Sequence, residues 1–387
     1  MQIIENTTTL NALCQKLGRE EFITIDLEFL REKTYYAHVC LIQVASPNEA
    51  AIIDPLAPGI ELDDFFALLK NPQITKVFHS GRQDIEILYK LSGIIPQPLF
   101  DTQIAAMVLG FGESVSYENL VNGILGIELD KSCRLSNWSL RPLDEKQLQY
   151  ALSDVTHLVR IYDSLRNRLK ETGRQHWLDE ETAVLTAPET YVVKPEDAWQ
   201  KMKHRSHNAR YLTILRELAA WRERRAQEKD IPRQMIIKDD CLLNLAAFCP
   251  TSREEMENIR NMRKDIVCGR LAPEILAVIA AAQKLPPEQY VKIEREKPIP
   301  TGATALYELL RLLLKIRSQE QGVVSKLIAS DDDLKNFASF RDKNNPILRG
   351  WRYEIFGQDA EALRQGRISI SYNKEKKAID IRKNTGD

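Results

Sequence analysis

The sequence lacks the features of a membrane-spanning protein, a secreted protein or a nucleotide-driven motor. It has no run of about 18 apolar residues, the length that spans a bilayer as a helix. Its first residues show no basic stretch followed by an apolar one, so we expect no secretory signal. The absence of G-x-x-x-x-G-K-[ST] excludes a helicase motor, and the absence of G-x-G-x-x-G after a predicted strand argues against a dinucleotide cofactor.

Cysteine is also scarce, with six among 387 residues and no C-x-x-C pair. This argues against a zinc ribbon and a disulfide framework, and it favours a cytoplasmic location, where thiols stay reduced. Apolar residues make up 43% of the chain and charged residues 28%, which is typical of folded domains. The length predicts two or three domains.

The net charge of -1 conceals an asymmetry between the two halves of the chain. Residues 1–190 contain 17 Lys and Arg against 27 Asp and Glu, whereas residues 191–387 contain 37 against 28. The acidic half is suited to holding a metal ion and the basic half to meeting a polyanion. Charge that drifts between domains without functional meaning explains the asymmetry equally well.

The acidic half alternates between strand and helix patterns, which predicts an α/β domain with a mixed sheet flanked by helices. The expected strands are 21–29, 35–46, 50–55, 75–80 and 98–102. The expected helices are 62–70, 83–93, 102–110, 117–126 and 143–170.

The basic half reads as two all-α segments, 208–285 and 303–370. Proline-containing linkers are expected at 186–205 and 286–302, and we expect the last stretch, 371–387, to be frayed.

Two acidic residues interrupt the first apolar strand. Asp26 and Glu28 stand two residues apart, so on a strand they share one face, while their neighbours are apolar. Two carboxylates on a largely buried strand repel each other and lose hydration, and a cation would relieve both costs. A D-x-E triplet is common, however, and by itself fits the end of a surface strand.

Two further acidic motifs lie on predicted helices. Asp84 falls in the first turn of a helix after a buried strand, where an acid also suits the helix dipole. Tyr150 and Asp154 are four residues apart on one helix face and flank an apolar stripe.

The four carboxylates can converge on one sheet edge from one strand and two helices. Oxygen ligands select hard cations such as Mg²⁺ or Mn²⁺ over zinc. Two such ions are suited to phosphodiester hydrolysis, and Tyr150 is placed to orient the attacking water.

With these motifs in this order, the sequence resembles the ribonuclease D family of 3′–5′ exonucleases, in the DEDD branch whose third motif carries Tyr. TIDLEF supplies Asp26 and Glu28, VFHSGRQDIEIL supplies Asp84, and LQYALSDV supplies Tyr150 and Asp154. The resemblance implies an RNase H-like catalytic domain at 1–185. It makes Asp26, Glu28, Asp84 and Asp154 the ligands of two divalent ions, Mg²⁺ or Mn²⁺, with Tyr150 as the fifth catalytic residue.

The basic half is similar to the helical HRDC module, which is named for helicases and RNase D. The similarity places one HRDC-like domain at 206–286 and a second, degenerate one at 300–372. Such modules bind nucleic acid or position the substrate, although helices that merely stabilise the catalytic domain remain an alternative.

The resemblance implies hydrolysis of RNA from its 3′ end with release of 5′-mononucleotides, most typically from tRNA precursors with 3′ extensions. We expect a monomer that needs no membrane and no nucleotide cofactor. Two alternatives stay open, namely a single-stranded DNA 3′–5′ exonuclease and a non-catalytic nucleic-acid-binding scaffold. Arg134, Trp138 and Arg141 precede the third motif and are candidates for holding phosphate and stacking a base, although a packed Trp beside surface Arg fits equally well.

Overall fold

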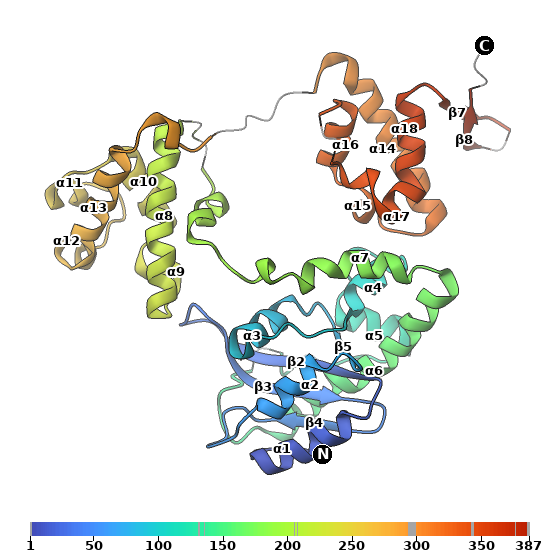
Figure 1. Cartoon of the computed structure of the whole chain (residues 1–387), viewed down its shortest axis with the longest axis horizontal. Helices are drawn as coiled ribbons and strands as arrows, with labels where there is room; N and C mark the ends of the chain where they lie inside the picture. Colours follow the sequence, from blue (N-terminus) through green and yellow to red (C-terminus); the bar gives the residue numbers. More distant parts are fainter. Residues whose placement is uncertain are drawn as a thin grey trace. The chain divides into compact units, whose positions relative to one another are not determined.

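The computed structural model describes residues 2–130, 132–134, 136–204, 206, 208–292, 299–341, 344–375 and 377–384 (Figure 1). The chain divides into two compact units. Unit 1 contains residues 1–28, 40–187 and 297–387, and unit 2 contains residues 29–39 and 188–296. None of the helices in the described ranges is long and apolar enough to cross a membrane.

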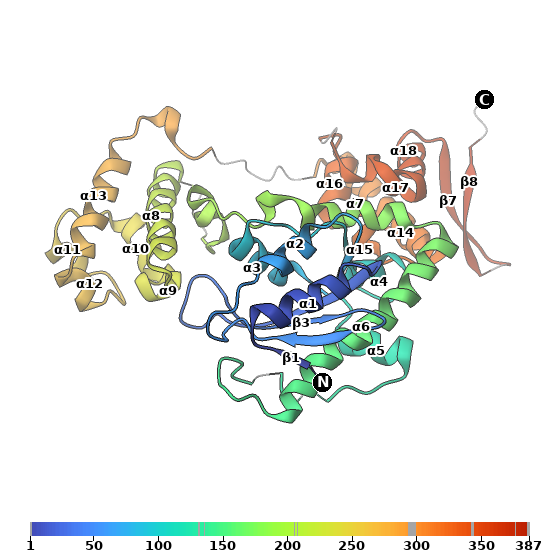
Figure 2. The same cartoon turned by 60° about the horizontal axis from the view of Figure 1, so that its bottom comes forward.

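The centre of unit 1 is a mixed sheet, which Figure 2 shows with β1 and β3 labelled. It has six strands in the order β1-β4-β3-β2-β5-β6. Strand β2 pairs in parallel with β5, and β5 with β6, whereas β3 and β4 are antiparallel. The strands are β1 Gln2–Ile4, β2 Phe22–Leu30, β3 His38–Ala45, β4 Ala50–Ile53, β5 Thr75–Phe78 and β6 Leu99–Asp101. Strand β1 had no counterpart among the predicted strands, because three residues are too few to show a period.

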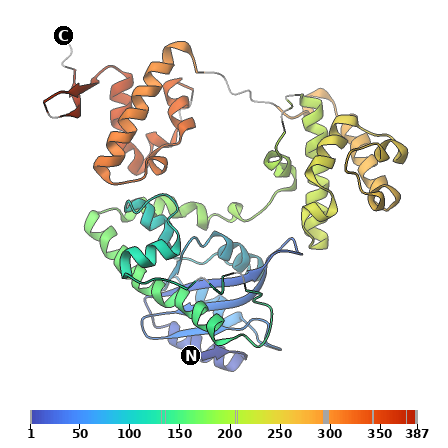
Figure 3. The same ribbon diagram turned by 180° about the vertical axis from the view of Figure 1, so that it is seen from behind.

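Helices cover both faces of this sheet. Helix α2 lies in front of the sheet in Figure 1, and α6 lies in front of it in Figure 3, which views the molecule from behind. Helix α6 packs on β4 and β5, and its start is fixed by a capping box at Asp144. The helices are α1 Thr7–Leu17, α2 Asp63–Lys70, α3 Arg82–Ser92, α4 Thr102–Val108, α5 Tyr117–Leu125, α6 Glu145–Thr172 and α7 Gln175–Thr186.

The second helical segment shares a hydrophobic core with this sheet and belongs to the same unit. The indole rings of Trp177 on α7 and Trp351 on α17 stack with centroids 4.6 Å apart, and Trp351 Nε1 donates to Glu181 at 3.1 Å. The helices of the segment are α14 Thr301–Gln321, α15 Ser325–Ile328, α16 Asp331–Ala338, α17 Gly350–Arg352 and α18 Gln358–Arg364.

The expectation of a frayed C-terminus is wrong for its described part. Residues Ile368–Asn373 and Ala378–Lys383 form the antiparallel strands β7 and β8, a separate two-stranded sheet. The alternation of Ile368 and Ile370 with serines turns one face of β7 toward the core. Residues 376 and 385–387 of this stretch lie outside the described residues.

Unit 2 is helical around a core of its own. The long helix α8, Ala209–Lys229, packs against α10, α13 and the 3₁₀ helix Pro195–Lys201, which lies in the predicted linker. The remaining helices are α9 Arg233–Ile236, α10 Asp239–Phe248, α11 Arg253–Glu257, α12 Lys264–Cys268 and α13 Leu271–Gln283. Of the second predicted linker, residues 293–298 lie outside the described residues.

Unit 2 also contains the segment 29–39, which joins β2 to β3 in the sequence. The amide of Tyr36 donates to Asp230 at 2.9 Å, and the hydroxyl of Tyr35 donates to the buried Glu223. The expected fold class, an α/β domain followed by helical segments, is confirmed. The three predicted domain boundaries stay predictions.

Candidate active site

Strand β2 presents two carboxylates to the face of the sheet that α6 covers. Thr24 is buried on this face, and its hydroxyl donates to the carbonyl of Val155 on α6 at 2.9 Å. Because side chains on a strand alternate, Asp26 and Glu28 follow Thr24 on the same face, and the buried Leu27 points to the other. The alternation of side chains along β2 therefore places both carboxylates on the face that α6, the helix with Tyr150 and Asp154, covers.

Asp154 on α6 meets these two carboxylates. Asp26, Glu28 and Asp154 each offer a carboxylate oxygen, and these oxygens lie within 4.8 Å of one another. The hydroxyl of Tyr117 donates to the carbonyl of Asp154 at 2.6 Å and so fixes this turn of α6. Tyr150 lies one turn earlier on the same helix, and the charge of Asp154 acts on its hydroxyl. Oxygen donors converging in this way suit a hard divalent cation.

Asp84 is buried in the first turn of α3, outside that close group but within electrostatic reach of Asp26 and Glu28. The turn before α3 is fixed by Asp101, whose carboxylate accepts from the amides of Ser80 at 3.2 Å and Gly81 at 2.9 Å. A Cβ on Gly81 would lie 2.5 Å from the Cβ of Phe78, so the turn has no room for a side chain. The same Asp101 caps α4.

Burial raises the pKa of every carboxyl group in this cluster, and repulsion by neighbouring carboxylates raises the pKa of Glu28, Asp84 and Asp154 further. Desolvation is the largest cause, and it raises the pKa of Asp26 to about 7, of Glu28 to about 9 and of Asp154 to about 8. The pKa of Asp84 is raised well above its ordinary value, first by desolvation and then by Asp26 and Asp101. One buried and three half-buried acids in electrostatic contact need protons or cations, and an all-carboxylate donor set fits Mg²⁺ or Mn²⁺.

Without a cation, the cluster makes the protein less stable as pH rises. The pKa values of about 7, 9 and 8 for folded Asp26, Glu28 and Asp154 stand above the ordinary 3.8, 4.5 and 3.8. Between about pH 4 and pH 9 the folded protein holds protons that the unfolded chain has released, so this stabilisation is complete below the window and is lost across it. We expect the melting temperature in chelator to fall across this window, and Mg²⁺ to restore it at the alkaline end.

The measurement is a thermal melt in EDTA or Mg²⁺ at a series of pH values. Asp154→Asn removes one of the repelling charges and should flatten the pH dependence in EDTA. A melting temperature that rises with pH in chelator would contradict this account.

Tyr150 stands beside a cavity of about 390 Å³. One side of the cavity is formed by α6, with Lys146, Gln149, Ser153 and His157 beside Tyr150. Residues 127–130, 132 and 133, which follow α5, line it as well. Burial and the charge of Asp154 raise the pKa of Tyr150, so its hydroxyl stays protonated and can donate a hydrogen bond. The cavity is thus lined by a proton donor, Tyr150, together with Lys146 and the acidic Glu128 and Asp130.

The three residues predicted to hold substrate have different surroundings. Trp138 is buried, its ring lies 6.0 Å from that of Tyr150, and its Nε1 is buried without a hydrogen-bond partner among the described residues. Arg134 is exposed, and its charge acts on Tyr150. Arg141 binds Asp54 with two nitrogens at 2.6 and 2.7 Å and also donates to the carbonyls of Trp138 and Cys40. These contacts give Arg141 a structural role, and substrate binding by the three residues stays a prediction.

Replacing Arg141 tests which role it has. Lys cannot reproduce the fork that binds both oxygens of the buried Asp54, so we expect Arg141→Lys to lower the free energy of unfolding by about 1–3 kcal/mol. RNA affinity should stay within about twofold, because these bonds occupy the guanidinium. Urea denaturation and fluorescence anisotropy measure the two effects, with Arg19→Lys as control, because Arg19 is exposed and is not a candidate for substrate binding. Lost affinity at unchanged stability would instead make Arg141 a substrate ligand.

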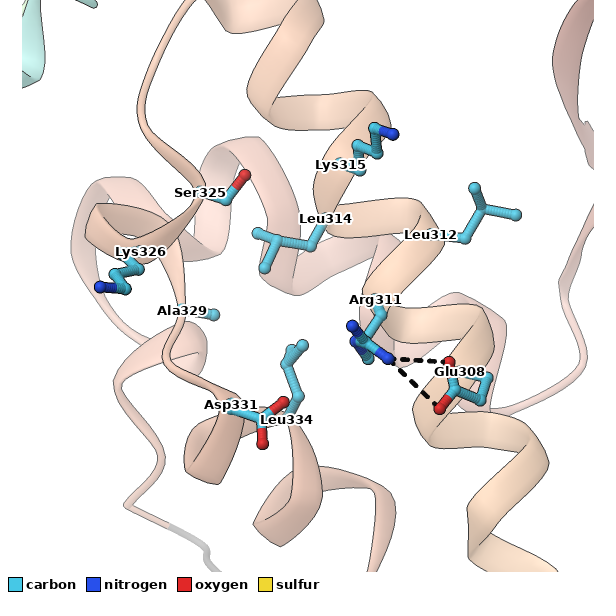
Figure 4. Close-up of a pocket in the computed structure, with 10 residues that line it drawn as sticks. All are labelled: Glu308, Arg311, Leu312, Leu314, Lys315, Ser325, Lys326, Ala329, Asp331 and Leu334. Carbon is cyan, nitrogen blue, oxygen red and sulfur yellow. Dashed lines mark hydrogen bonds and ion pairs between the residues drawn. The ribbon is translucent and has the colours of Figure 1, made fainter. Parts of the chain in front are cut away.

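A larger cavity, of about 650 Å³, lies in the second helical segment between α14, α15 and α16. Figure 4 shows Arg311 at its edge, paired with Glu308 on the same helix at 3.2 Å. None of the four carboxylates of the cluster lines it. Cavity size therefore does not locate the site, whereas convergent charge does.

The sequence did not predict two residues that fix the geometry around the site, Tyr117 and Asp54. Tyr117 binds the backbone of α6 across 37 residues, and Asp54 binds Arg141 across 87 residues. No local pattern signals such pairs, because they depend on how distant elements pack.

Comparison with known proteins agrees with this geometry. A family model described as 3′-5′ exonuclease matches residues 1–170, and one described as HRDC domain matches residues 212–279. Ribonuclease D of Bartonella henselae is 42% identical over 371 residues, which are 96% of this chain and 91% of that protein. Ribonuclease D of Granulibacter bethesdensis is 44% identical over 371 residues, 95% of this chain and 93% of that protein.

The crystal structure of Escherichia coli RNase D, described as an exoribonuclease involved in structured RNA processing, superposes with a TM-score of 0.82. It is 28% identical in sequence, and the match covers 94% of this chain and 98% of that one. Sequence identity above 40% along nearly the whole chain and a shared architecture lead to the same result. The chain belongs to the ribonuclease D family of 3′–5′ exoribonucleases.

Proposed function

We propose that the chain hydrolyses RNA one nucleotide at a time from the 3′ end and releases 5′-mononucleotides, with two divalent ions held by Asp26, Glu28, Asp84 and Asp154. One observation carries the proposal, namely the convergence of carboxylate oxygens from β2 and α6 within 4.8 Å. When bound, Mg²⁺ or Mn²⁺ supplies Lewis acidity for attack on a phosphodiester. The scaffold alternative is disfavoured because all four carboxylates of the motifs are present.

The residues of the chain supply orientation around this cluster. Tyr150 lies one turn from Asp154 on α6 and its hydroxyl stays protonated, so it can hold the attacking water by one hydrogen bond. Trp138 is buried beside Tyr150, so its ring can hold the Tyr150 side chain in position next to the cluster.

We further propose tRNA precursors with 3′ extensions as substrates, a monomeric state and a cytoplasmic location. The proposal of tRNA precursors rests on the family and on the second half of the chain, where basic residues outnumber acidic ones. An excess of positive charge favours binding of a large polyanion such as a tRNA body. The location rests on the chemistry of the six cysteines, all free in the described structure.

A labelled RNA with a tRNA body and a short 3′ extension tests the activity. We expect a ladder that shortens from the 3′ end with Mg²⁺ or Mn²⁺, stops with EDTA and yields 5′-mononucleotides. An RNA carrying a 3′-phosphate serves as the blocked control, and a DNA of the same sequence tests the alternative substrate.

The outcomes separate the alternatives cleanly. Equal or faster shortening of the DNA twin would replace RNA by single-stranded DNA as the preferred substrate. Binding without shortening under all metal conditions would favour the non-catalytic scaffold.

A further inference from the structure

Unit 2 holds a cavity of about 320 Å³ that is separate from the carboxylate cluster. Three stretches distant in sequence build it: the segment that follows β2, the 3₁₀ helix Pro195–Lys201 with Met202, and the region from α8 to the start of α10. A cavity of this size lies at the small end of the range for ligand sites, so it fits one small group rather than a nucleic-acid helix.

Positive charge dominates the lining of this cavity. Its cationic side chains are Arg31, Lys201, Arg222 and Arg233, and Asp239 is the one acidic residue among those that line it in the described structure. Arg222 pairs with Asp239 at 2.7 Å, and Arg233 pairs with the buried Glu223 at 2.6 Å. The two acids leave a positive excess around a small cavity.

Arg222 contributes a buried positive charge to the lining of the cavity. Only 4% of its side chain is exposed, and Nη1 donates to the carbonyl of Ile237 at 2.9 Å in addition to its contact with Asp239. Its Nε is buried without an acceptor among the described residues. A buried guanidinium with an unsatisfied nitrogen is costly, and an anion in the cavity would offset part of that cost by its field.

The cavity is held in shape by a network of buried polar contacts. Glu223 accepts from the Tyr35 hydroxyl, and the guanidinium of Arg233 lies 5.4 Å from the centroid of the Tyr35 ring. Gln227 links Tyr35 to the carbonyl of Val193 through hydrogen bonds of 3.3 and 3.1 Å. Arg222 and Arg233 are therefore held in place before any ligand arrives, which reduces the entropic cost of binding one.

We propose that this cavity binds a phosphate group of a ribonucleotide. Several guanidinium groups around a small volume match the oxygens of phosphate, and Lys201 adds a mobile point charge. The phosphate can come from the backbone of an RNA substrate or from a released 5′-nucleotide. The choice of a ribonucleotide rests on the proposed function, whereas the anion site rests on the geometry of unit 2.

The test measures binding to the full-length protein in EDTA, so that no hydrolysis occurs. Arg31→Glu with Lys201→Glu changes two exposed residues, and we expect it to weaken the affinity for fluorescein-labelled single-stranded RNA about tenfold and to lower the salt slope by about one. Arg31→Ala with Lys201→Ala should give a smaller loss in the same direction. Melting temperatures establish that each variant is folded.

The matched control is Lys264→Glu with Lys284→Glu, two exposed lysines of the same unit that do not line the cavity. Titrations with AMP in place of RNA separate the sources. A loss for RNA alone assigns the site to the backbone, a loss for AMP alone assigns it to a released nucleotide, and a loss for both means that it accepts either.

Affinities for RNA and AMP within twofold of the control pair would overturn the proposal. Because no cleavage is measured, that result would leave the proposed hydrolysis untouched. Likewise, failure of hydrolysis would not change the binding result.

Discussion

Asp154→Asn is expected to lower the rate of RNA hydrolysis by a factor of about 10³ or more while RNA affinity stays within about twofold. The substitution keeps the shape of the side chain but removes a negative charge from the group that converges with Asp26 and Glu28. With one ligand charge fewer, the remaining carboxylates would hold a divalent cation less tightly, and the Lewis acidity that the cation would supply to the reaction would be reduced. Single-turnover cleavage of a 5′-labelled RNA in Mg²⁺, with anisotropy in EDTA, measures both quantities.

Asp163→Asn is the matched control for this experiment. Asp163 is exposed on the same helix α6 and lies outside the carboxylate group, so its replacement should leave the rate within twofold. Asp26→Asn, on strand β2, should lower the rate of RNA hydrolysis to a similar extent. Near-normal turnover in either variant of the cluster would show that the ligand assignment is wrong.

The second large effect is on stability, and it arises far from the carboxylates. Trp351 is 0% exposed, stacks on Trp177 and donates to Glu181. Trp351→Ala removes a large buried ring and leaves Glu181 without that donor, so we expect the free energy of unfolding to fall by about 3–5 kcal/mol. Urea denaturation followed by circular dichroism measures this loss.

Phe340→Ala in the same helical segment is the comparison, because that ring is 73% exposed and its removal should cost less than about 1 kcal/mol. Equal losses in the two variants would mean that the tryptophan stack contributes nothing particular. The same contact bears on experimental design, since truncation before residue 297 uncovers Trp177. Roles of the C-terminal segment are therefore best tested by point substitutions in the full chain.

Much of the site was predictable because its parts are local patterns. Alternation on a strand places Asp26 and Glu28 on one face, and a spacing of four places Tyr150 and Asp154 on one face of a helix. The predicted helix 143–170 and the observed α6 differ by two residues at each end, because a capping box and a C-terminal glycine fix its limits. The difference between the acidic first half and the basic second half of the chain was likewise evident from residue counts alone.

Other features depended on contacts between residues distant in sequence. Tyr117 holds the turn of Asp154, and Asp54 occupies Arg141, which by its position alone suggested a substrate ligand. The segment after Glu28 takes its partners from α8 and from Asp230, which caps that helix, so strand pairing alone does not describe its surroundings.

The sequence by itself determined the order of the motifs, the elements that carry them and the chemistry of their side chains, since each depends on neighbours within about one turn or one strand. Only the tertiary structure decided that three of the four acids share one small volume, that Trp351 joins the second helical segment to Trp177, and that four cations surround a cavity in unit 2. These outcomes follow from the packing of whole faces against one another. Local periodicity fixes which face a residue occupies but not which distant face it meets.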